Sequence, residues 1–243
     1  MKFYNVFFVL VLLNVFCLSA QDINQFDENG KHHGIWRKHY KGTKVLRYEG
    51  EFFHGKEIGE FRFYINDNGK QVLSATRTFS KTGEKAQVKF FNPQGKIISE
   101  GTMKGKTYVG TWKYYQNKGD SLLIIEHFND NGDLEGERLT YYENGQVAEQ
   151  QHYVKGKLDG ESKWYSESGV VLKAFKYVNG ELHGPAKYYD FKGELVTEGH
   201  YVNGKKTGIW KYYEGNKLTE EKDFTYKPKY IKVNGKYKKA PQE

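Results

Sequence analysis

The sequence repeats a short phrase at a nearly constant interval along most of its length. Residues 177–191 read YVNGELHGPAKYYDF and residues 201–215 read YVNGKKTGIWKYYEG, so Asn-Gly, a second Gly and a Tyr-Tyr pair are kept while the letters between them change. Such a period indicates a fold of equivalent supersecondary units, because each unit buries its apolar side chains against its neighbours. The duplicated phrase therefore describes how the chain is built and not a single active site.

Eight units can be aligned on the Gly that opens GIWKYY, which we call the anchor glycine. The steps between successive anchors are 25, 27, 24, 26, 24, 24 and 24 residues. In the third unit Ala replaces the anchor glycine, and Arg138 and Ser162 replace the aromatic residue two positions after the anchor in the fifth and sixth units. The anchors are Gly34, Gly59, Ala86, Gly110, Gly136, Gly160, Gly184 and Gly208.

Each unit carries the signals of one β-hairpin. The segments between turn residues are about five to eight residues long, too short for stable helices and normal for strands. The chain has 20 Tyr, 16 Phe and 27 Gly but only four Pro, a mixture that favours strands and tight turns. Asn-Gly pairs supply the positive φ values that two-residue hairpin turns require. We expect such turns at Asn29-Gly30, Asn68-Gly69, Asn131-Gly132, Asn144-Gly145, Asn179-Gly180 and Asn203-Gly204.

The fold class that follows is all-β. Two strands per unit give sixteen sequential antiparallel strands, which at about 4.8 Å spacing predict a twisted ribbon on the order of 75 Å long. Because side chains alternate along a strand, the residues two and four positions after the anchor share one face, and the next tyrosine points to the other. We expect an aromatic row on the concave side of the ribbon, and the C-terminal segment VNGKYKK as a partial unit that closes the last edge.

Aligned in this way, the unit resembles the MORN repeat: G-x-W-x-Y-Y, then x-x-N-G, a strand with Glu and an aromatic residue, and Y-x-N-G-K-x-x-G. The 24-residue step is similar to that of the bacterial MORN-variant (YwqK-type antitoxin-like) family, and the resemblance covers about residues 26–225. It implies about eight stacked β-hairpins in an elongated, curved antiparallel meander that contacts proteins or lipids and has no catalytic site. An antitoxin activity is a further implication of the same resemblance.

The N-terminal residues differ from the repeat. The stretch MKFYNVFFVLVLLNVFCLSAQ has a basic Lys2, an apolar run and then Leu-Ser-Ala, which is typical of a secretory signal peptide cleaved after Ala20. An uncleaved membrane anchor is one alternative, although the apolar run is short and is followed by Asn14. Lipidation of Cys17 is another, although the residues before it do not match a lipobox.

These features divide the chain into a signal peptide (1–20), a MORN-variant repeat domain (21–225) and a basic C-terminal tail or cap (226–243). We expect the product to be exported, and to be periplasmic, at the cell surface or secreted. Cys17 is the only cysteine, so the mature chain would hold no disulfide or thiolate site. Of the net charge of +8, residues 225–243 contribute +5, and the central part is nearly neutral. The basic tail suits an anionic membrane surface, whereas the near-neutral body and the export signal argue against nucleic acid.

Residues with catalytic or metal-binding chemistry are present, but their pattern argues against an enzyme. His32 and His33 are adjacent in an expected turn, where neighbouring histidines rarely bind metal without further ligands. Three glutamates recur at what we take as one slot of the second strand, and repetition favours pairing with lysines of the adjacent aromatic strand over catalysis. The glutamates are Glu100, Glu149 and Glu198, and the lysines are Lys113, Lys187 and Lys211. The sequence contains no G-x-S-x-G, P-loop or H-E-x-x-H pattern.

The sequence thus predicts a non-enzymatic repeat protein, without cofactor or metal, that provides a protein-binding or scaffolding surface. Two alternatives stay open: an antitoxin or immunity-type protein, and a peripheral module for anionic lipid. The aromatic rows either contact a partner or pack the sheet. The identity of a protein partner and the oligomeric state are left open. The candidate binding residues are Trp36, Phe61, Trp112, Tyr114, Trp164, Tyr188, Trp210, Tyr212, Lys236, Lys238 and Lys239.

Overall fold

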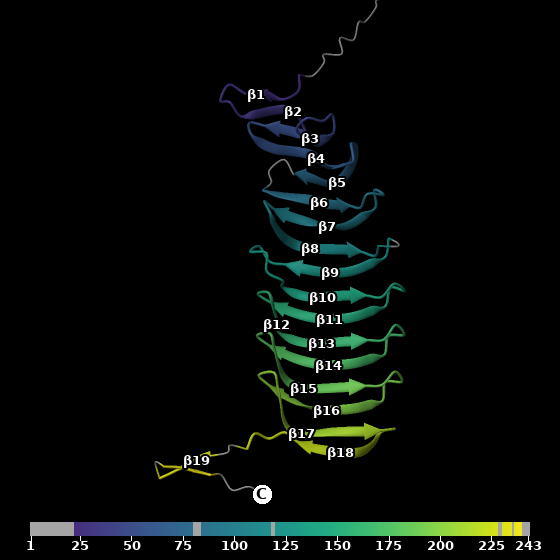
Figure 1. Cartoon of the computed structure of the whole chain (residues 1–243), viewed down its shortest axis with the longest axis vertical. Coiled ribbons are helices and arrows are strands. Elements are labelled where there is room, and N and C mark those ends of the chain that lie inside the picture. Colours follow the sequence, from purple (N-terminus) through teal and green to yellow (C-terminus); the bar gives the residue numbers. More distant parts are fainter. Residues whose placement is uncertain (1–21, 80–83, 118–119, 228–229, 235, 240–243) are drawn as a thin grey trace, which may run out of the picture.

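The computed structural model describes residues 22–79, 84–117, 120–227, 230–234 and 236–239. The expected signal peptide at residues 1–20 lies outside them. Within the described residues the chain has no helix and forms a single layer of antiparallel strands stacked along one axis (Figure 1). The all-β class and the long antiparallel meander of stacked hairpins are therefore confirmed.

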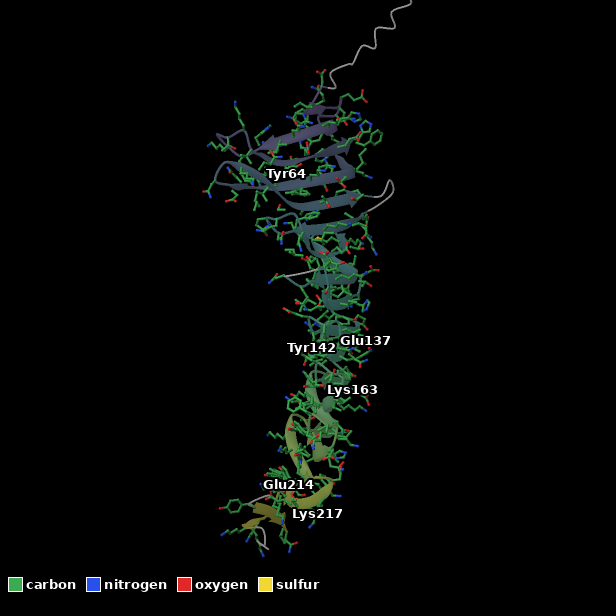
Figure 2. All side chains as sticks on the ribbon, turned by 90° about the vertical axis from the view of Figure 1, so that its right-hand side faces the viewer. Tyr64, Glu137, Tyr142, Lys163, Glu214 and Lys217 are labelled. Atoms are coloured by element: carbon green, nitrogen blue, oxygen red, sulfur yellow. The ribbon has the colours of Figure 1, made fainter. Side chains whose placement is uncertain are left out.

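Each strand of the large sheet pairs with the next one along the chain. The strands are β1 (Gln25–Phe26), β2 (His32–His39), β3 (Leu46–Phe53), β4 (Lys56–Asp67), β5 (Lys70–Phe79), β6 (Lys85–Phe91), β7 (Ile97–Lys104), β8 (Thr107–Tyr115), β9 (Leu122–Phe128), β10 (Gly136–Tyr141), β11 (Val147–Val154), β12 (Lys157–Leu158), β13 (Gly160–Tyr165), β14 (Val171–Val178), β15 (Glu181–Tyr189), β16 (Leu195–Val202), β17 (Lys205–Glu214), β18 (Lys217–Asp223), β19 (Tyr230–Val233) and β20 (Lys236–Lys239). The first 18 form one sheet, in which β12 and β13 share the first strand of the sixth unit. The sheet twists along its length, and side chains project from both sides of its single layer (Figure 2).

Two kinds of turn connect the strands. At Asn68, Asn179 and Asn203 both the Asn and the following Gly have positive φ, as a two-residue turn requires. At Asn29, Asn131 and Asn144 this expectation was wrong, because only the following Gly has positive φ. There the loop is longer: the Tyr142 N–H donates to the Gln146 carbonyl (2.9 Å), and a type I turn precedes the left-handed glycine.

In most units the anchor glycine lies at a bulge, where the register to the preceding strand shifts. The seven glycine anchors all have positive φ, for example 68° at Gly110. Around Gly110 the four steps from Val109 to Lys113 face only two steps on β7, so the register shifts. Glycine takes this conformation without strain, which explains its recurrence. At Ala86, which lies outside the left-handed region, β5 and β6 pair without a register shift.

The bulge explains how a single-layer sheet buries a tryptophan. Trp112 is 0% exposed, and on one side its ring covers Gly101 of β7, where an added Cβ would lie 2.4 Å from the ring. On the other side Tyr108, which precedes the bulge, stacks on the indole at a centroid distance of 3.8 Å. The Trp112 Nε1–H donates to the Thr102 carbonyl (3.0 Å), so the N–H group of the buried indole also has a hydrogen-bond acceptor.

The residues two positions after the anchors and their cross-strand neighbours are complementary in size. Phe61 covers Gly50, and Trp210 covers Gly199, in the same way as Trp112 covers Gly101. Where the residue two positions after the anchor is small, as at Ala186, its neighbour on β14 is the large Phe175. Close packing is thereby kept along the ribbon although individual units differ.

Polar contacts interrupt this buried row in the fifth and sixth units. Arg138 Nε lies 3.3 Å from a Glu126 carboxylate oxygen, and its Nη1 lies 3.6 Å from one of Glu149. The same guanidinium donates to Gln151 Oε1 (3.3 Å). The Ser162 hydroxyl is buried without a hydrogen-bond partner among the described residues. Hydrogen bonds and ion pairs thus replace ring packing around Arg138 in the fifth unit.

The two ends of the large sheet differ. At the N-terminal end β1 pairs with β2, and Asn24 Oδ1 accepts from the Arg37 N–H (2.8 Å), so part of this edge is covered. At the C-terminal end β18 is exposed along its whole length and rich in charge, as is typical of a protected edge strand. The expectation that VNGKYKK closes this edge was wrong. Val233 is the last residue of β19 and Lys236–Lys239 form β20, and these two strands pair with each other in a separate sheet.

Candidate functional site

The face that carries Trp36, Phe61, Trp112 and Trp210 is called the front face. Four of the candidate residues, Tyr114, Trp164, Tyr188 and Tyr212, lie on it in one continuous cross-strand row. Neighbours in this front row pair directly on adjacent strands: Lys38, Tyr48, Phe63, Ala75, Phe90, Ser99, Tyr114, Ile124, Thr140, Glu149, Trp164, Lys173, Tyr188, Thr197, Tyr212 and Glu220. The expected sharing of one face is confirmed by this register.

The candidate residues on the front face differ in accessibility. Trp36 is 9% exposed, Phe61 is 1% exposed, and Trp112 and Trp210 are 0% exposed, so these rings pack the sheet. The four members of the front row are half-buried and keep part of each ring at the surface. A partner that approached this face would meet the front row and not the buried rings.

The candidate lysines lie apart from the aromatic residues. Lys236, Lys238 and Lys239 are exposed on β20, in the separate hairpin beyond the end of the large sheet (Figure 1). The structure therefore offers two distinct candidate surfaces, an aromatic one along the ribbon and a basic one at its C-terminal end.

The opposite face, called the back face, carries a second continuous row that is mostly charged. From strand to strand it runs through Arg37, Glu49, Arg62, Thr76, Lys89, Glu100, Lys113, Ile125, Leu139, Gln150, Lys163, Ala174, Lys187, Glu198, Lys211 and Glu221. The residue three positions after the anchor is basic in every unit except the fifth, where it is Leu139. In this back row, basic residues of the aromatic strands alternate with residues of the second strands.

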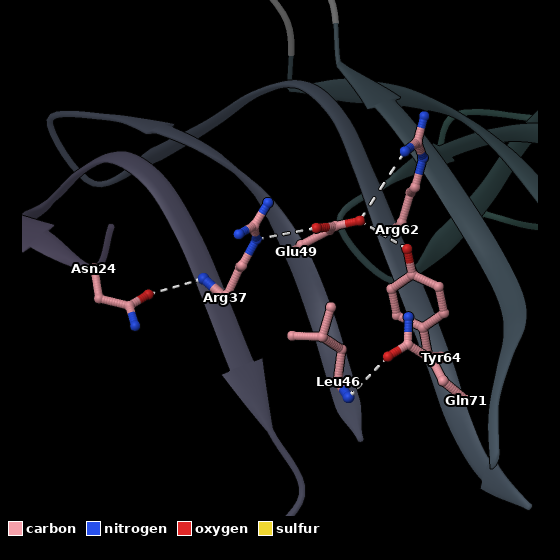
Figure 3. A network of polar contacts seen from close by, with 7 residues as sticks. All are labelled: Asn24, Arg37, Leu46, Glu49, Arg62, Tyr64 and Gln71. Atoms are coloured by element: carbon pink, nitrogen blue, oxygen red, sulfur yellow. Dashed lines mark hydrogen bonds and ion pairs between the residues drawn. The ribbon is translucent and has the colours of Figure 1, made fainter. Parts of the chain in front are cut away.

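Glu49 shows how the back row binds a carboxylate. One carboxylate oxygen lies 3.3 Å from Arg37 Nε, and the other lies 4.0 Å from Arg62 Nη1. The Tyr64 hydroxyl donates to the same carboxylate at 2.7 Å (Figure 3). We call this arrangement, with a basic residue on each neighbouring strand and a tyrosine hydroxyl, a carboxylate clamp.

The clamp recurs along the back face. Glu100 lies between Lys89, at 3.7 Å, and Lys113, and the Tyr115 hydroxyl donates to it. Glu198 lies between Lys187 and Lys211, and the Tyr213 hydroxyl donates to it at 2.8 Å. The register places Lys113, Lys187 and Lys211 next to Glu100 or Glu198, as expected, but among the described residues the ion pair within 4.0 Å at these two carboxylates is the one between Lys89 and Glu100. The tyrosine fifteen residues after the carboxylate is the part of the clamp that sequence reasoning missed, although the constant Tyr-Tyr pair was its signal.

The clamp tyrosines have perturbed acidity. Burial, together with the hydrogen bond to Glu49, raises the pKa of Tyr64 to about 12. Burial and the bond to Glu100 raise the pKa of Tyr115 to about 12. Each of these phenols therefore stays protonated, and able to donate, throughout the neutral pH range.

The assignment of Glu149 to the same slot as Glu100 and Glu198 was wrong. Gln150 occupies that place in the back row, and it accepts from the Tyr165 hydroxyl at 2.9 Å. Glu149 points to the front face, where it pairs with Arg138. Glu149 follows its anchor by 13 residues, whereas Glu100 and Glu198 follow theirs by 14, and a difference of one residue moves a side chain to the other face.

His32 and His33 lie among aromatic rings at the N-terminal end of the sheet. His32 and His33 lie in β2 and not in a turn, and His32 stacks on Trp36 at a centroid distance of 3.7 Å. Among the described residues, no group of three or more His, Cys, Asp or Glu side chains is arranged to hold a metal ion. The part of the chain that the structure covers also contains no helix with the length and apolarity needed to cross a membrane.

A single-layer open sheet of repeated hairpins with two uncovered faces defines the class of β-hairpin repeat proteins. The family model described as MORN repeat variant matches residues 134–155, 158–179 and 182–203. Each of these three consecutive segments contains one hairpin, of which β10–β11 is the first. The three matched segments are therefore similar to MORN-variant repeats, and such repeats suggest a module that binds proteins or membrane lipids.

No curated protein matches the chain. Among solved structures, a match is found to a crystal structure of an S. aureus TarM mutant in complex with fondaparinux, alpha-GlcNAc-glycerol and UDP. The identity is 16%, the match covers 51% of this chain and 19% of that chain, and the TM-score is 0.19. A likeness at this score carries no argument about fold or function.

Proposed function

We propose that this chain is an exported, non-enzymatic repeat protein that binds a protein partner and acts as a scaffold for it. The observation that carries the proposal is the front row, in which Tyr114, Trp164, Tyr188 and Tyr212 remain partly exposed on an uncovered face. Tyrosine and tryptophan supply large contact areas with few rotatable bonds, and they dominate protein interfaces. Export is supported by the signal-peptide pattern of residues 1–20.

A pull-down from the exported fraction tests this proposal. The tagged full chain is expected to retain a partner that the double variant Trp164→Ala/Tyr212→Ala loses, because both rings belong to the front row. Lys113→Ala on the back face is the matched control and is expected to retain the partner. Circular dichroism confirms that each variant is folded. Equal recovery by the wild type and the folded double variant would contradict a role for the front row.

The YwqK-type antitoxin-like assignment is a narrower form of the same proposal. An antitoxin or immunity-type protein occludes one specific toxin, so the pull-down would return a single partner in stoichiometric amount. Recovery of such a partner, with loss of its toxicity in the complex, favours the antitoxin role over general scaffolding. Recovery of several partners in the same experiment favours a scaffold.

Binding to anionic lipid is a second candidate function, because Lys236, Lys238 and Lys239 are exposed on the β19–β20 hairpin and Tyr226 before it is 83% exposed. Basic residues near an anionic bilayer contribute about 1 kcal/mol each. Flotation with phosphatidylglycerol vesicles at low salt tests this function, and the triple Lys→Gln variant of these residues is expected to stay unbound. Failure of the wild type to float removes this candidate.

A further inference from the structure

One position of the back row lacks the carboxylate that the clamps contain. Ala174 of β14 lies directly opposite Lys163 on β13 and opposite Lys187 on β15. The corresponding place between two basic residues is taken by Glu49 and Glu198 in other units. Both basic arms of a clamp are therefore present at Ala174 without the acid between them.

The tyrosine of the clamp is present as well. Tyr189 follows Ala174 by the same interval as Tyr64 follows Glu49, and it lies next to Tyr188 at the end of β15. The pKa of Lys163 is raised, first by its hydrogen bond to Glu161 and to a smaller extent by the phenols of Tyr165 and Tyr189. Tyr189 thus takes the place of the clamp tyrosine in the register, and the methyl group of Ala174 offers its hydroxyl no acceptor.

The surface is hollow at this point. A depression of about 230 Å³ is lined by Lys163, Lys176 and Lys187 around Ala174, with Glu161 as the one carboxylate. Glu161 is 74% exposed on its side chain and lies 3.1 Å from Lys163 Nζ. An exposed ion pair of this kind adds little stability. It also leaves further N–H groups of the Lys163 ammonium able to donate. Positive charge therefore exceeds negative charge in the hollow.

Glu198, the neighbour of Lys187 on β16, does not supply the carboxylate that is missing at Ala174. Glu198 is opposite Lys187 on β16, where the Tyr213 hydroxyl already donates to its carboxylate at 2.8 Å. Its position is one strand beyond Lys187, so it belongs to the next clamp. A carboxylate above Ala174 would instead lie between Lys163 and Lys187.

The other interruptions of the back row lack one or more parts of the clamp. Thr76 lies between Arg62 and Lys89, but the residue at the tyrosine position is Phe91, which has no hydroxyl. Ile125 faces Lys113 on one side and the apolar Leu139 on the other. Within the described strands, Ala174 is the interruption that keeps two basic residues and a tyrosine.

We propose that Lys163, Lys187 and the Tyr189 hydroxyl form an open carboxylate clamp that binds an aspartate or glutamate side chain of a partner protein. The inference rests on the proposed protein-binding function and adds a second contact on the back face. A carboxylate is the chosen occupant because the chain itself places a glutamate in the same frame at Glu49, between two basic residues and beneath a phenol. Opposite charge in a matched geometry gives specificity to such a contact.

Zero-length carbodiimide crosslinking of the full chain to a hexaglutamate peptide tests this inference, because it joins a carboxylate to a lysine only when the two are in contact. Mass spectrometry of the product is expected to show the peptide on Lys163, which has no glutamate beside it in the back row, in preference to Lys113 and Lys211, which lie beside Glu100 and Glu198. A hexaglutamine peptide amide is the uncharged control. Mapping by residue also separates the clamp from the basic C-terminal tail.

Two matched variants sharpen the result. Ala174→Glu supplies the missing carboxylate within the chain, and because a tethered group competes at millimolar effective concentration, peptide labelling of Lys163 and Lys187 is expected to fall about tenfold or more. Ala174→Gln adds a side chain of the same size without charge and is expected to keep most of the labelling. Glu198→Ala opens a second clamp, so labelling of Lys211 is expected to rise.

Three results would overturn the inference: equal labelling of all back-row lysines, labelling confined to the tail, or unchanged labelling in Ala174→Glu. If phosphatidylglycerol vesicles protect Lys163 while the peptide does not react there, the occupant is a lipid phosphate and the protein carboxylate is rejected. The test is separable from the proposed function. If Ala174→Glu retains a partner that depends on the front row with unchanged affinity, only the clamp inference fails.

Discussion

The packing of Trp112 against Gly101 makes a quantitative prediction for Gly101→Ala. The new Cβ would lie 2.4 Å from the indole ring, and Tyr108 stacked on the far side at 3.8 Å prevents the ring from moving away. The φ of Gly101 is not positive, so backbone strain does not contribute. Overpacking destabilises the folded state by about 1–3 kcal/mol. Replacing glycine by alanine stabilises it by about 0.4–1 kcal/mol, because alanine lowers the conformational entropy of the unfolded chain. We expect a net loss of about 1–2 kcal/mol in the free energy of local unfolding.

Native-state hydrogen exchange of the β7 and β8 amides is the appropriate assay, because repeat sheets open locally and a single global unfolding free energy is poorly defined for them. In a Trp112→Ala background the ring is absent, so Gly101→Ala is expected to be neutral or stabilising. The double-mutant cycle should therefore show coupling of about 1–2 kcal/mol.

Gly110→Ala is the matched control for this cycle. Gly110 has a φ of 68° and nothing within 4 Å of an added Cβ. Its substitution costs stability through the backbone alone, so Trp112→Ala is not expected to rescue it. If Gly101→Ala is equally costly with and without the indole, additive within about 0.5 kcal/mol, the packing argument is refuted.

Three further predictions concern polar contacts. Burial and the hydrogen bond to Glu49 raise the pKa of Tyr64 in the folded protein to about 12. The stability that the protonated phenol provides is therefore complete below pH ~10 and is lost as the pH rises toward 12. Spectrophotometric titration of the phenol should show that Glu49→Gln lowers this pKa. The hydrogen bond from His54 lowers the pKa of Asp27, so its stabilisation exists above pH ~4 and disappears on further acidification, and Asp27→Asn should flatten acid unfolding there. Arg138→Ala should cost about 1.5–3 kcal/mol in the free energy of local unfolding, measured by hydrogen exchange of the β10 and β11 amides, since its carboxylate partners lose their donor.

Much of the fold was predictable because the same sequence pattern recurs in successive units. The anchor spacing, the alternation of Trp112 and Tyr114 on one face, and the two strands per unit follow from the period of the sequence and from strand geometry. The all-β meander was therefore predicted from sequence. The bulge at most of the glycine anchors was not, because a recurrent glycine indicates a special φ without saying which residues it displaces.

The burial of the tryptophans was not predictable either. Gly50, Gly101 and Gly199 follow a glutamate and lie outside the recurring turn and anchor positions, but their role under the rings depends on the register across strands. The candidate set consequently mixed buried rings such as Trp210 with half-buried ones such as Tyr212. The front and back rows each join residues of many units, and only the pairing of strands shows which residues meet.

The back row was missed for a related reason. The recurrence of glutamate led to the choice of Glu149, although Gln150 stands at the same distance from its anchor as Glu100 and Glu198 do, and this choice concealed the regular alternation of the row. With the register known, Ala174 is recognisable as the exception, and the tyrosine that accompanies each carboxylate becomes visible.

The polar contacts of Arg138 and the unsatisfied hydroxyl of Ser162 have a consequence for unfolding. In a one-dimensional array, cooperativity passes only between adjacent units, so the weakest junction decides where the array divides. Ring packing is strong before this junction, around Trp112, and again after it, around Trp210. Under denaturant or mechanical tension, the N-terminal and C-terminal halves should therefore melt as two separate blocks, with the boundary in the fifth and sixth units.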